Sequence, residues 1–252
     1  MIIKNKILTN EDVIKLNLEP NSSVKLLNTI GQNPDVIEKI SPNVKIQVLG
    51  PYDPQTNIRF AEDKYASRTF YSPKTLSLAI KKMEEIESGI SPDFSEMEKA
   101  LFVFDKLVKM VGYDYDQKYE GHNRNLESLT NNFSRCAGFS VCYKEMIDRL
   151  NIKNEFKNVP NIHSFNVLYI DNKKFVVDTT WARTNYDDNE KYLRNFGCLN
   201  DVDMFLTHEV PGEHVKYNSL KLKDVEEVFN GLQTKKLNSK PKNNSSDLTN
   251  EL

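Results

Sequence analysis

The chain has little of what several common protein classes need. Its 252 residues include 9 glycines, 3 cysteines and one tryptophan. So few glycines argue against a glycine-rich phosphate-binding loop. Three cysteines do not make a disulfide framework, so we expect reduced thiols. No apolar run approaches the roughly 20 residues of a membrane span, and the N-terminus has no signal-peptide pattern. We therefore expect a cytoplasmic protein with no membrane partner, although a protein exported without a leader would look the same.

An excess of charge of one sign is also missing. The chain carries 34 basic and 36 acidic residues, a formal net charge of −2. Electrostatic capture of nucleic acid needs a clear basic excess, so the sequence argues against a nucleic-acid partner. What is present is an apolar fraction of 38% beside 28% charged residues, which is enough for a packed core. The length allows one large domain or two modest ones, and it leaves the oligomeric state open.

The first 92 residues contain a short pattern that occurs twice. Each copy predicts a helix, a turn and a strand, so we expect a small α/β region over residues 1–92. A true repeat would indicate an interaction surface. The alternative is chance similarity in a sequence rich in asparagine and lysine. The copies are Asp12-Val13-Ile14, Pro20-Asn21 and Val24-Lys25-Leu26, then Asp35-Val36-Ile37, Pro42-Asn43 and Val44-Lys45-Ile46.

The rest of the chain divides into a predicted catalytic segment and a tail. A helix is predicted over residues 74–88, and Gly89-Ile90-Ser91-Pro92 ends it, so we place a domain boundary there. Residues 93–234 then form the second predicted domain. Residues 235–252 are polar, and we expect them to form a disordered tail.

Two amphipathic helices are predicted within the second domain. Ser95 and Glu98 have the spacing of a capping box, and apolar residues at helical spacing follow as far as Val111. The second helix begins at Cys136. Its apolar stripe is Phe139, Cys142, Tyr143, Met146 and Leu150, with Lys144, Glu145, Asp148 and Arg149 largely opposite.

Cys136 is a candidate nucleophile. Free backbone N–H groups and the positive end of a helix stabilise a thiolate, and Arg135 adds positive charge. The small residues Ala137 and Gly138 would let a substrate backbone approach closely. The alternative is a buried structural thiol, which is the interpretation we prefer for Cys142 on the apolar stripe.

Two predicted strands supply a histidine and a carboxylate. His163 opens an apolar strand over residues 162–170, and Asp178 follows the apolar run of a second strand over residues 175–180. Residues 171–174 form the predicted turn. A buried carboxylate needs a partner, because an unpaired buried charge costs several kcal/mol.

The predicted hairpin puts both groups on one face. If Ile170 pairs with Phe175, Asp178 lies opposite Val167, which shares a face with His163 by period two. The idealised register still leaves the two groups roughly 13 Å apart. We therefore expect a bulge or a longer irregular turn to close the gap.

Three blocks of sequence occur in a definite order. They are residues 136–140 (Cys-Ala-Gly-Phe-Ser), 163–167 (His-Ser-Phe-Asn-Val) and 177–181 (Val-Asp-Thr-Thr-Trp). Together they resemble the signature of the transglutaminase-like superfamily, over roughly residues 93–185. The resemblance implies an α+β protein with a papain-like core, in which a nucleophile at a helix N-terminus packs on an antiparallel sheet.

The chain departs from the family pattern at two positions. Thr179 stands where the family often has proline, and Phe165 where it often has tryptophan. Neither change removes a reacting group, so the implied triad is kept, but the inference about substrate is weakened.

The resemblance also implies a role for individual side chains. Asp178 would orient the imidazole of His163, which would deprotonate Cys136 and later protonate the leaving amine. Trp181 either packs beneath the site or contacts substrate. The implied oxyanion donors are Tyr113, Tyr115 and Gln117, and the implied substrate-binding residues are Gly138 and Trp181.

The implied reaction is attack by Cys136 on a peptide or carboxamide carbonyl of a protein or peptide substrate, through a thioester and without a cofactor. Hydrolysis by a protease or deamidase is favoured over crosslinking by a transglutaminase, because it needs only water and no second-substrate site is evident. The rival of another class is a non-catalytic interaction module that retains the fold.

Metal sites have weak support in the sequence, and we expect none. A zinc site built from Cys136, Cys142, His163 and Cys198 would lack the usual C-x-x-C or H-x-x-x-H spacing. The acidic stretch at residues 186–190 lacks the glycine and terminal glutamate of an EF-hand calcium loop. The histidines at positions 122, 208 and 214 show no pattern that indicates a function.

Overall fold

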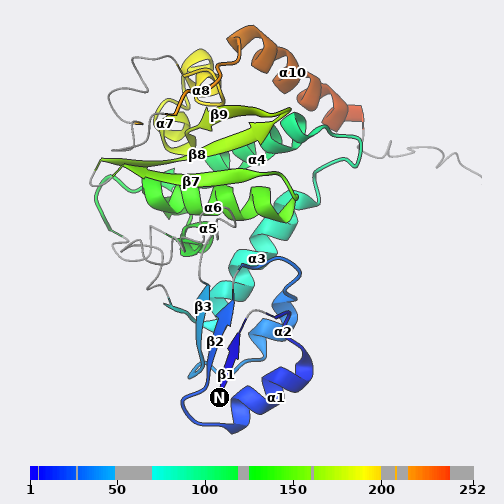
Figure 1. Cartoon of the computed structure of the whole chain (residues 1–252), viewed down its shortest axis with the longest axis vertical. Helices are drawn as coiled ribbons and strands as arrows, with labels where there is room; N and C mark the ends of the chain where they lie inside the picture. Colours follow the sequence, from blue (N-terminus) through cyan, green and yellow to red (C-terminus); the bar gives the residue numbers. More distant parts are fainter. Residues whose placement is uncertain are drawn as a thin grey trace, which may run out of the picture.

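The structure, a computed structural model, describes residues 1–4, 6–26, 28–48, 70–118, 125–159, 162–199, 208 and 215–238. It is a mixed α+β protein with several small sheets, one of them a three-stranded antiparallel sheet (Figure 1). The predicted α+β class is confirmed. Within these ranges, no helix is long and apolar enough to cross a membrane. His122 and His214 lie outside the described residues.

The N-terminal part of the chain follows the doubled pattern of its sequence. Its elements are β1 (Ile2–Lys4), α1 (Asn10–Leu18), β2 (Ser23–Leu26), α2 (Pro34–Glu38), β3 (Lys45–Val48) and β4 (Phe70–Tyr71). The first three strands run parallel, and β4 is antiparallel to β3. A helix followed by a strand therefore occurs twice, as predicted. In the sheet Val24 lies opposite Ile46, so the sequence copies are offset by two residues from the strand register.

The two helices flanking the predicted domain boundary are both present. They are α3 (Pro73–Glu87) and α4 (Glu96–Met110). Serine caps explain where they begin, because Ser72 and Ser95 each accept a backbone N–H from the first turn. Glu98 completes the predicted capping box by accepting from the N–H of Ser95.

The remaining elements surround an antiparallel sheet, β7–β8–β9, with α6 running along one of its faces (Figure 1). The bounds are β5 Gly112–Tyr113, α5 Glu127–Asn131, β6 Phe133–Ser134, α6 Cys136–Arg149, β7 Asn154–Val159, β8 His163–Ile170, β9 Lys173–Val177, α7 Thr179–Thr184, α8 Asn189–Arg194 and α10 Leu222–Asn238. The helix predicted to start at Cys136 is thus confirmed.

The β8–β9 hairpin corrects the predicted register. Asp171 and Asn172 both have positive φ, which is typical of a tight two-residue turn, so Ile170 pairs with Lys173 rather than with Phe175. The second strand ends at Val177 rather than at residue 180, because Asp178 caps α7. The tight turn moves Asp178 two positions closer to His163, so neither a bulge nor a longer turn is needed.

One hydrophobic core crosses the predicted domain boundary. Buried apolar residues on both sides of the boundary, from Ile3 to Leu232, belong to one cluster, and a second, smaller cluster includes Phe165 and Val167. Polar contacts cross as well, since the N–H and hydroxyl of Thr29 both donate to buried Glu145 of α6. Residues 1–92 therefore contact the polar side of the helix that begins with Cys136, at Glu145 and Arg149.

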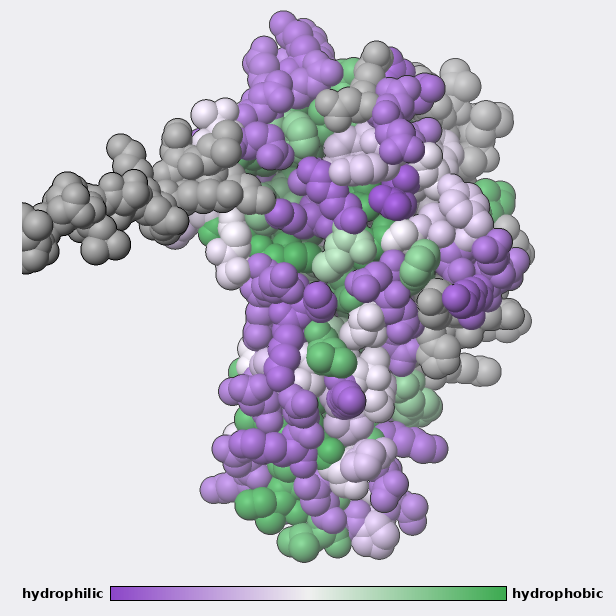
Figure 2. Space-filling model, turned by 180° about the vertical axis from the view of Figure 1, so that it is seen from behind, coloured by the Kyte–Doolittle hydropathy of each residue, from purple (hydrophilic) through white to green (hydrophobic). Residues whose placement is uncertain are grey.

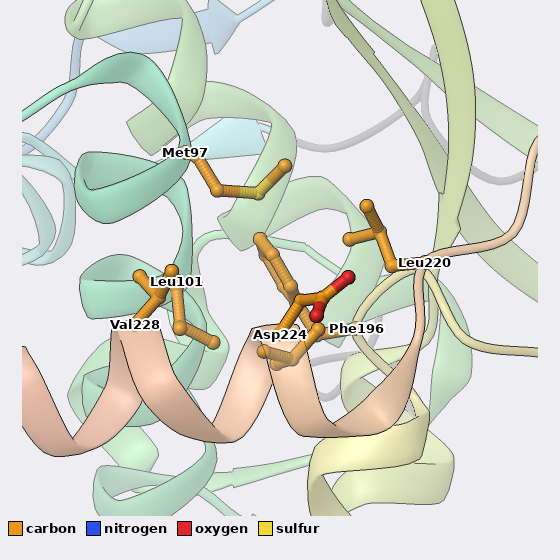
Figure 3. A pocket seen from close by; sticks show the side chains of 7 residues that line it. Met97, Leu101, Phe196, Leu220, Asp224 and Val228 are labelled. Carbon is orange, nitrogen blue, oxygen red and sulfur yellow. The ribbon is translucent and has the colours of Figure 1, made fainter.

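The C-terminal helix shortens the predicted tail. Residues 235–238 belong to α10, and Lys235 pairs with Glu98 of α4. The rest of the predicted tail, residues 239–252, lies outside the described residues. An apolar pocket lies between α4 and α10, lined by Met97, Leu101, Phe196 and Leu220, among others, and it contains none of the predicted site residues (Figure 3). Seen from behind, the surface is largely hydrophilic (Figure 2).

Candidate active site

Cys136 occupies the first position of α6. Arg135 has extended backbone angles (φ −111, ψ 178) and caps the helix without a side-chain hydrogen bond, so the N–H groups of the first turn stay available. The preceding strand β6 is fixed by pairing with β5, in which Tyr113 lies beside Ser134. This pairing sets the point at which the chain turns into the helix, and with it the position of the sulfur.

The surroundings of Cys136 favour a thiolate. Burial would raise the pKa of the thiol, but a hydrogen bond with the side chain of His163 and backbone N–H groups of Ser164 and Ala137 outweigh it, so the pKa of Cys136 is lowered. Arg135, which the sequence suggested as a source of positive charge, is not among the main causes. Cys136 is half-buried, in contrast to the buried Cys142.

His163 is held between Cys136 and Asp178. Its Nε2 lies 2.6 Å from Oδ2 of Asp178, and both side chains are buried. Because Nε2 is engaged by the carboxylate, Nδ1 is the ring nitrogen left for the sulfur. Burial would lower the pKa of His163, but the carboxylate outweighs burial and raises it to about 10. The structure therefore brings the three side chains together in a continuous Cys–His–Asp chain of contacts.

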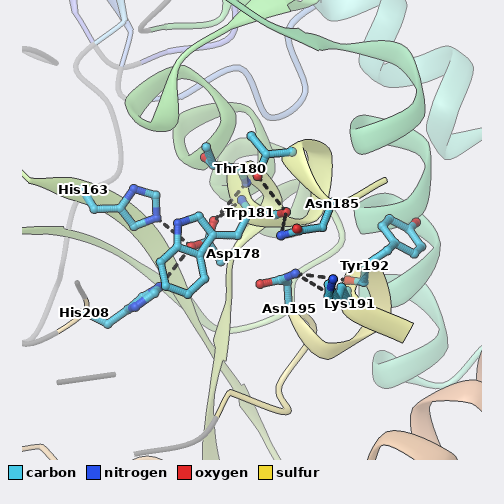
Figure 4. A network of polar contacts seen from close by, with 10 residues as sticks. His163, Asp178, Thr180, Trp181, Asn185, Lys191, Tyr192, Asn195 and His208 are labelled. Atoms are coloured by element: carbon cyan, nitrogen blue, oxygen red, sulfur yellow. Dashed lines mark hydrogen bonds and ion pairs between the residues drawn. The ribbon is translucent and has the colours of Figure 1, made fainter. Parts of the chain in front are cut away.

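Asp178 is a fully satisfied buried carboxylate (Figure 4). As the cap of α7, its Oδ1 accepts from the N–H groups of Thr180 and Trp181, at 3.0 and 2.9 Å. Its Oδ2 accepts from His163 and from a second imidazole, that of His208, at 3.0 Å. Burial would raise the pKa of Asp178, yet these partners hold it well below its ordinary range.

His208 is a member of the site that the sequence did not indicate. Its ring is 1% exposed and contacts Asp178, which lies 30 residues earlier in the chain. It belongs to no strand or helix, and no spacing rule links it to the Asp178 block. No local signal in the sequence could therefore have identified it.

Trp181 packs against the site. Its ring stacks on that of His163 at a centroid distance of 5.8 Å and an interplanar angle of 27°. It also meets the ring of His208 edge-on, at 4.8 Å. The indole remains partly exposed, so the first of the two predicted alternatives, packing against the site, describes its contacts.

The other predicted site residues occupy less direct positions. Tyr113 is half-buried in β5 and meets the exposed ring of Tyr115 at 4.7 Å. Gln117 is exposed and has a positive φ of 53°. Gly138 is buried within α6, so it is not open to a substrate in this structure, whereas Ala137 is half-buried. Of the three oxyanion candidates, Tyr113 is the one that the β5–β6 pairing brings toward Cys136.

The remaining thiols have different surroundings. Cys142 is buried and donates to the backbone carbonyl of Asn125, and burial raises its pKa strongly. Cys198 is half-buried, and burial raises its pKa to about 11. The ligand set weighed for zinc is not assembled. Within the part of the chain that the structure describes, the group of possible metal ligands is His163, Asp178 and His208, with ligand atoms within 4.8 Å of one another.

Comparisons with known proteins add nothing to this description of the site. No known family model matches the chain. A search of curated proteins finds no match either.

Proposed function

We propose that the chain is a transglutaminase-like thiol enzyme with a papain-like core, and that Cys136, His163 and Asp178 are its catalytic residues. The observation that carries the proposal is the continuous contact from Cys136 through His163 to Asp178. It supports the proposal because a buried carboxylate that orients an imidazole, which in turn lowers the pKa of a thiol, is the arrangement that nucleophilic catalysis requires.

The reaction follows from these roles. The thiolate of Cys136 attacks the carbonyl carbon of a peptide bond or carboxamide, and the negative charge moves to the carbonyl oxygen. When the C–N bond breaks, His163 gives its proton to the leaving nitrogen, and a thioester remains on Cys136. Water, deprotonated by His163, then attacks the thioester. The C–S bond breaks, the carboxylic acid is released, and the thiolate of Cys136 and the protonated His163 are restored. The substrate class is a protein or peptide.

Hydrolysis is favoured over amine transfer because it needs only water and no binding site for a second substrate. An amine in place of water would give a new amide, which is the crosslinking reaction. The alternative of another class, an interaction module, draws on the doubled helix–strand pattern of residues 1–92. An interaction module would not explain why the pKa of Cys136 is lowered.

Alkylation with iodoacetamide near pH 6 tests the proposal, with labelling at each cysteine measured by mass spectrometry. Cys136 should react far faster than Cys198, which is also half-buried but has a raised pKa. A His163→Ala variant should lose this advantage, and a Cys198→Ser variant should keep it. Equally slow labelling of Cys136 and Cys198 would favour the interaction module.

A second experiment identifies the chemistry. Wild-type and Cys136→Ala proteins are added separately to a cell extract, with and without a labelled primary amine. Shortened peptides or released ammonia that require Cys136 indicate hydrolysis. Incorporation of the amine that requires Cys136 indicates crosslinking, and the absence of any Cys136-dependent change in repeated extracts would count against the enzyme.

A further inference from the structure

Two imidazoles share one oxygen of Asp178. Nε2 of His163 lies 2.6 Å from Oδ2, and Nε2 of His208 lies 3.0 Å from the same atom. An ionised carboxylate oxygen only accepts, so both rings donate an N–H to it. The other oxygen, Oδ1, is already taken by two backbone N–H groups of α7. His208 therefore adds nothing to the capping of the helix; it acts on the oxygen that faces His163.

The ring of His208 is held in place by aromatic neighbours. It meets Trp181 at 4.8 Å and 90°, and Phe165 at 4.6 Å and 64°. It also meets His163 edge-on at 5.3 Å. Packed in this way and 1% exposed, the ring keeps its N–H directed at Asp178.

We propose that His208 is a positioning residue that weakens the hold of Asp178 on the proton of His163. Each donor stabilises the ionised carboxylate, so Asp178 with two donors on one oxygen attracts the proton of His163 less strongly than it would with one. The catalytic cycle needs His163 both to accept a proton from Cys136 and to release it to the leaving nitrogen. A carboxylate that His163 alone neutralised would bind that proton too firmly. This inference rests on the proposed function, because it assigns His208 a role in the same site.

The titratable groups around Asp178 determine in which direction the loss of His208 should shift the pKa of His163. The titratable side chains that act on Asp178 are His163 and His208, and Cys136 acts on His163. The aromatic rings packed against His208 carry no charge at neutral pH. Removing the N–H of residue 208 should therefore strengthen the Asp178–His163 pair and extend the thiolate–imidazolium state of Cys136 and His163 to higher pH, because His163 then holds its proton more firmly.

Three variants separate the effect of the N–H donor of His208 from the effect of its size and aromatic ring. His208→Gln keeps an N–H donor on a flexible chain, and His208→Met has nearly the same size and no donor. His208→Phe keeps an aromatic ring without the donor. For each, the rate of Cys136 alkylation by iodoacetamide is measured from pH 4 to about pH 11, which spans the pKa of His163 of about 10. The thermal midpoint and the metal content of protein purified without chelator are measured as well.

The Met and Phe variants should move the upper midpoint of the alkylation profile, at which His163 loses its proton, up by about half a unit, which is about threefold in the proton affinity of His163. The Gln variant should keep the wild-type midpoint. In a Cys136→Ala background, an NMR titration of the histidines should show a higher pKa for His163 in the Met variant than in the Gln variant.

Other outcomes overturn the inference. A wild-type midpoint in the Met and Phe variants, or the same shift in Gln as in Met, removes the role of the donor. A Met or Phe variant that does not fold assigns His208 a structural role instead. Stoichiometric metal in the wild type that is lost in the Met variant makes His208 a metal ligand. If wild-type Cys136 itself behaves as an ordinary thiol, the proposed function fails first, and that result is distinct from all of these.

Discussion

Asn166 of β8 donates through Nδ2 to the backbone carbonyl of Ser140 in α6, at 3.0 Å. Both residues are buried. The contact ties the strand that begins with His163 to the first turns of the helix that begins with Cys136. It therefore helps to set the spacing between imidazole and sulfur.

Replacing Asn166 should affect stability and reactivity together. Asn166→Ala should lower the free energy of unfolding by about 1–3 kcal/mol, because a buried hydrogen bond is lost, and should slow alkylation of Cys136. Urea unfolding can be followed by fluorescence, since Trp181 is the single tryptophan and lies against His163. Asn154→Ala is the control. It removes a 2.9 Å bond to Asp148 near the other end of α6, so it should cost similar stability and leave Cys136 unaffected. Loss of reactivity in both variants would contradict a local effect of Asn166.

The two functions of Asp178, charge and cap, can be separated. Asp178→Asn keeps an oxygen that can cap α7 but removes the charge that orients His163, so the fold should persist and turnover should fall by on the order of 10⁴. Asp178→Ala removes both and should cost about 1 kcal/mol more in unfolding free energy. Denaturant unfolding and kinetics of the two variants check this. Full turnover in the Asn variant would refute the role assigned to the charge.

The raised pKa of His163 predicts how stability depends on pH. A folded-state pKa of about 10, against an ordinary 6.5, means that the protonated ring stabilises the native state fully below pH 6.5. That contribution should be lost progressively as the pH rises from 6.5 through 10. The lowered pKa of Asp178 has the opposite sign, so its contribution is present above pH 3.8 and is lost as the pH falls well below that value. Urea midpoints of the wild type and of His163→Gln should converge toward pH 10, and parallel curves would disprove the coupling.

The contact between the N-terminal part and α6 can be tested at Glu145. Its Oε1 accepts from both the N–H and the hydroxyl of Thr29, while burial raises its pKa. Glu145→Ala should destabilise the protein by about 1–3 kcal/mol, because two buried donors are left unpaired. Glu145→Gln keeps an acceptor and removes a buried charge, so it should cost much less. Chemical denaturation of the two variants measures the difference, and an equal loss in both would show that the charge itself matters.

The local elements were predictable because their signals are local. The capping box of Ser95 and Glu98 marks the start of α4 within a few residues, and the apolar stripe after Cys136 marks α6. The alternation of strand side chains also gave the correct face for His163 and Asp178. The turn was wrong, because the conformation of Asp171 and Asn172 decides between a two-residue and a four-residue turn, and the pairing shifts with it.

The sequence by itself indicated the α+β class and the start of the helix at Cys136, and it singled out Cys136, His163 and Asp178, since each of these signals lies in a short local pattern. Tertiary structure alone decided that Asp178 is shared by two imidazoles and that Thr29 donates to Glu145 of α6. Those contacts join residues 30 and 116 positions apart. Their formation depends on how the whole chain packs, which no short pattern records.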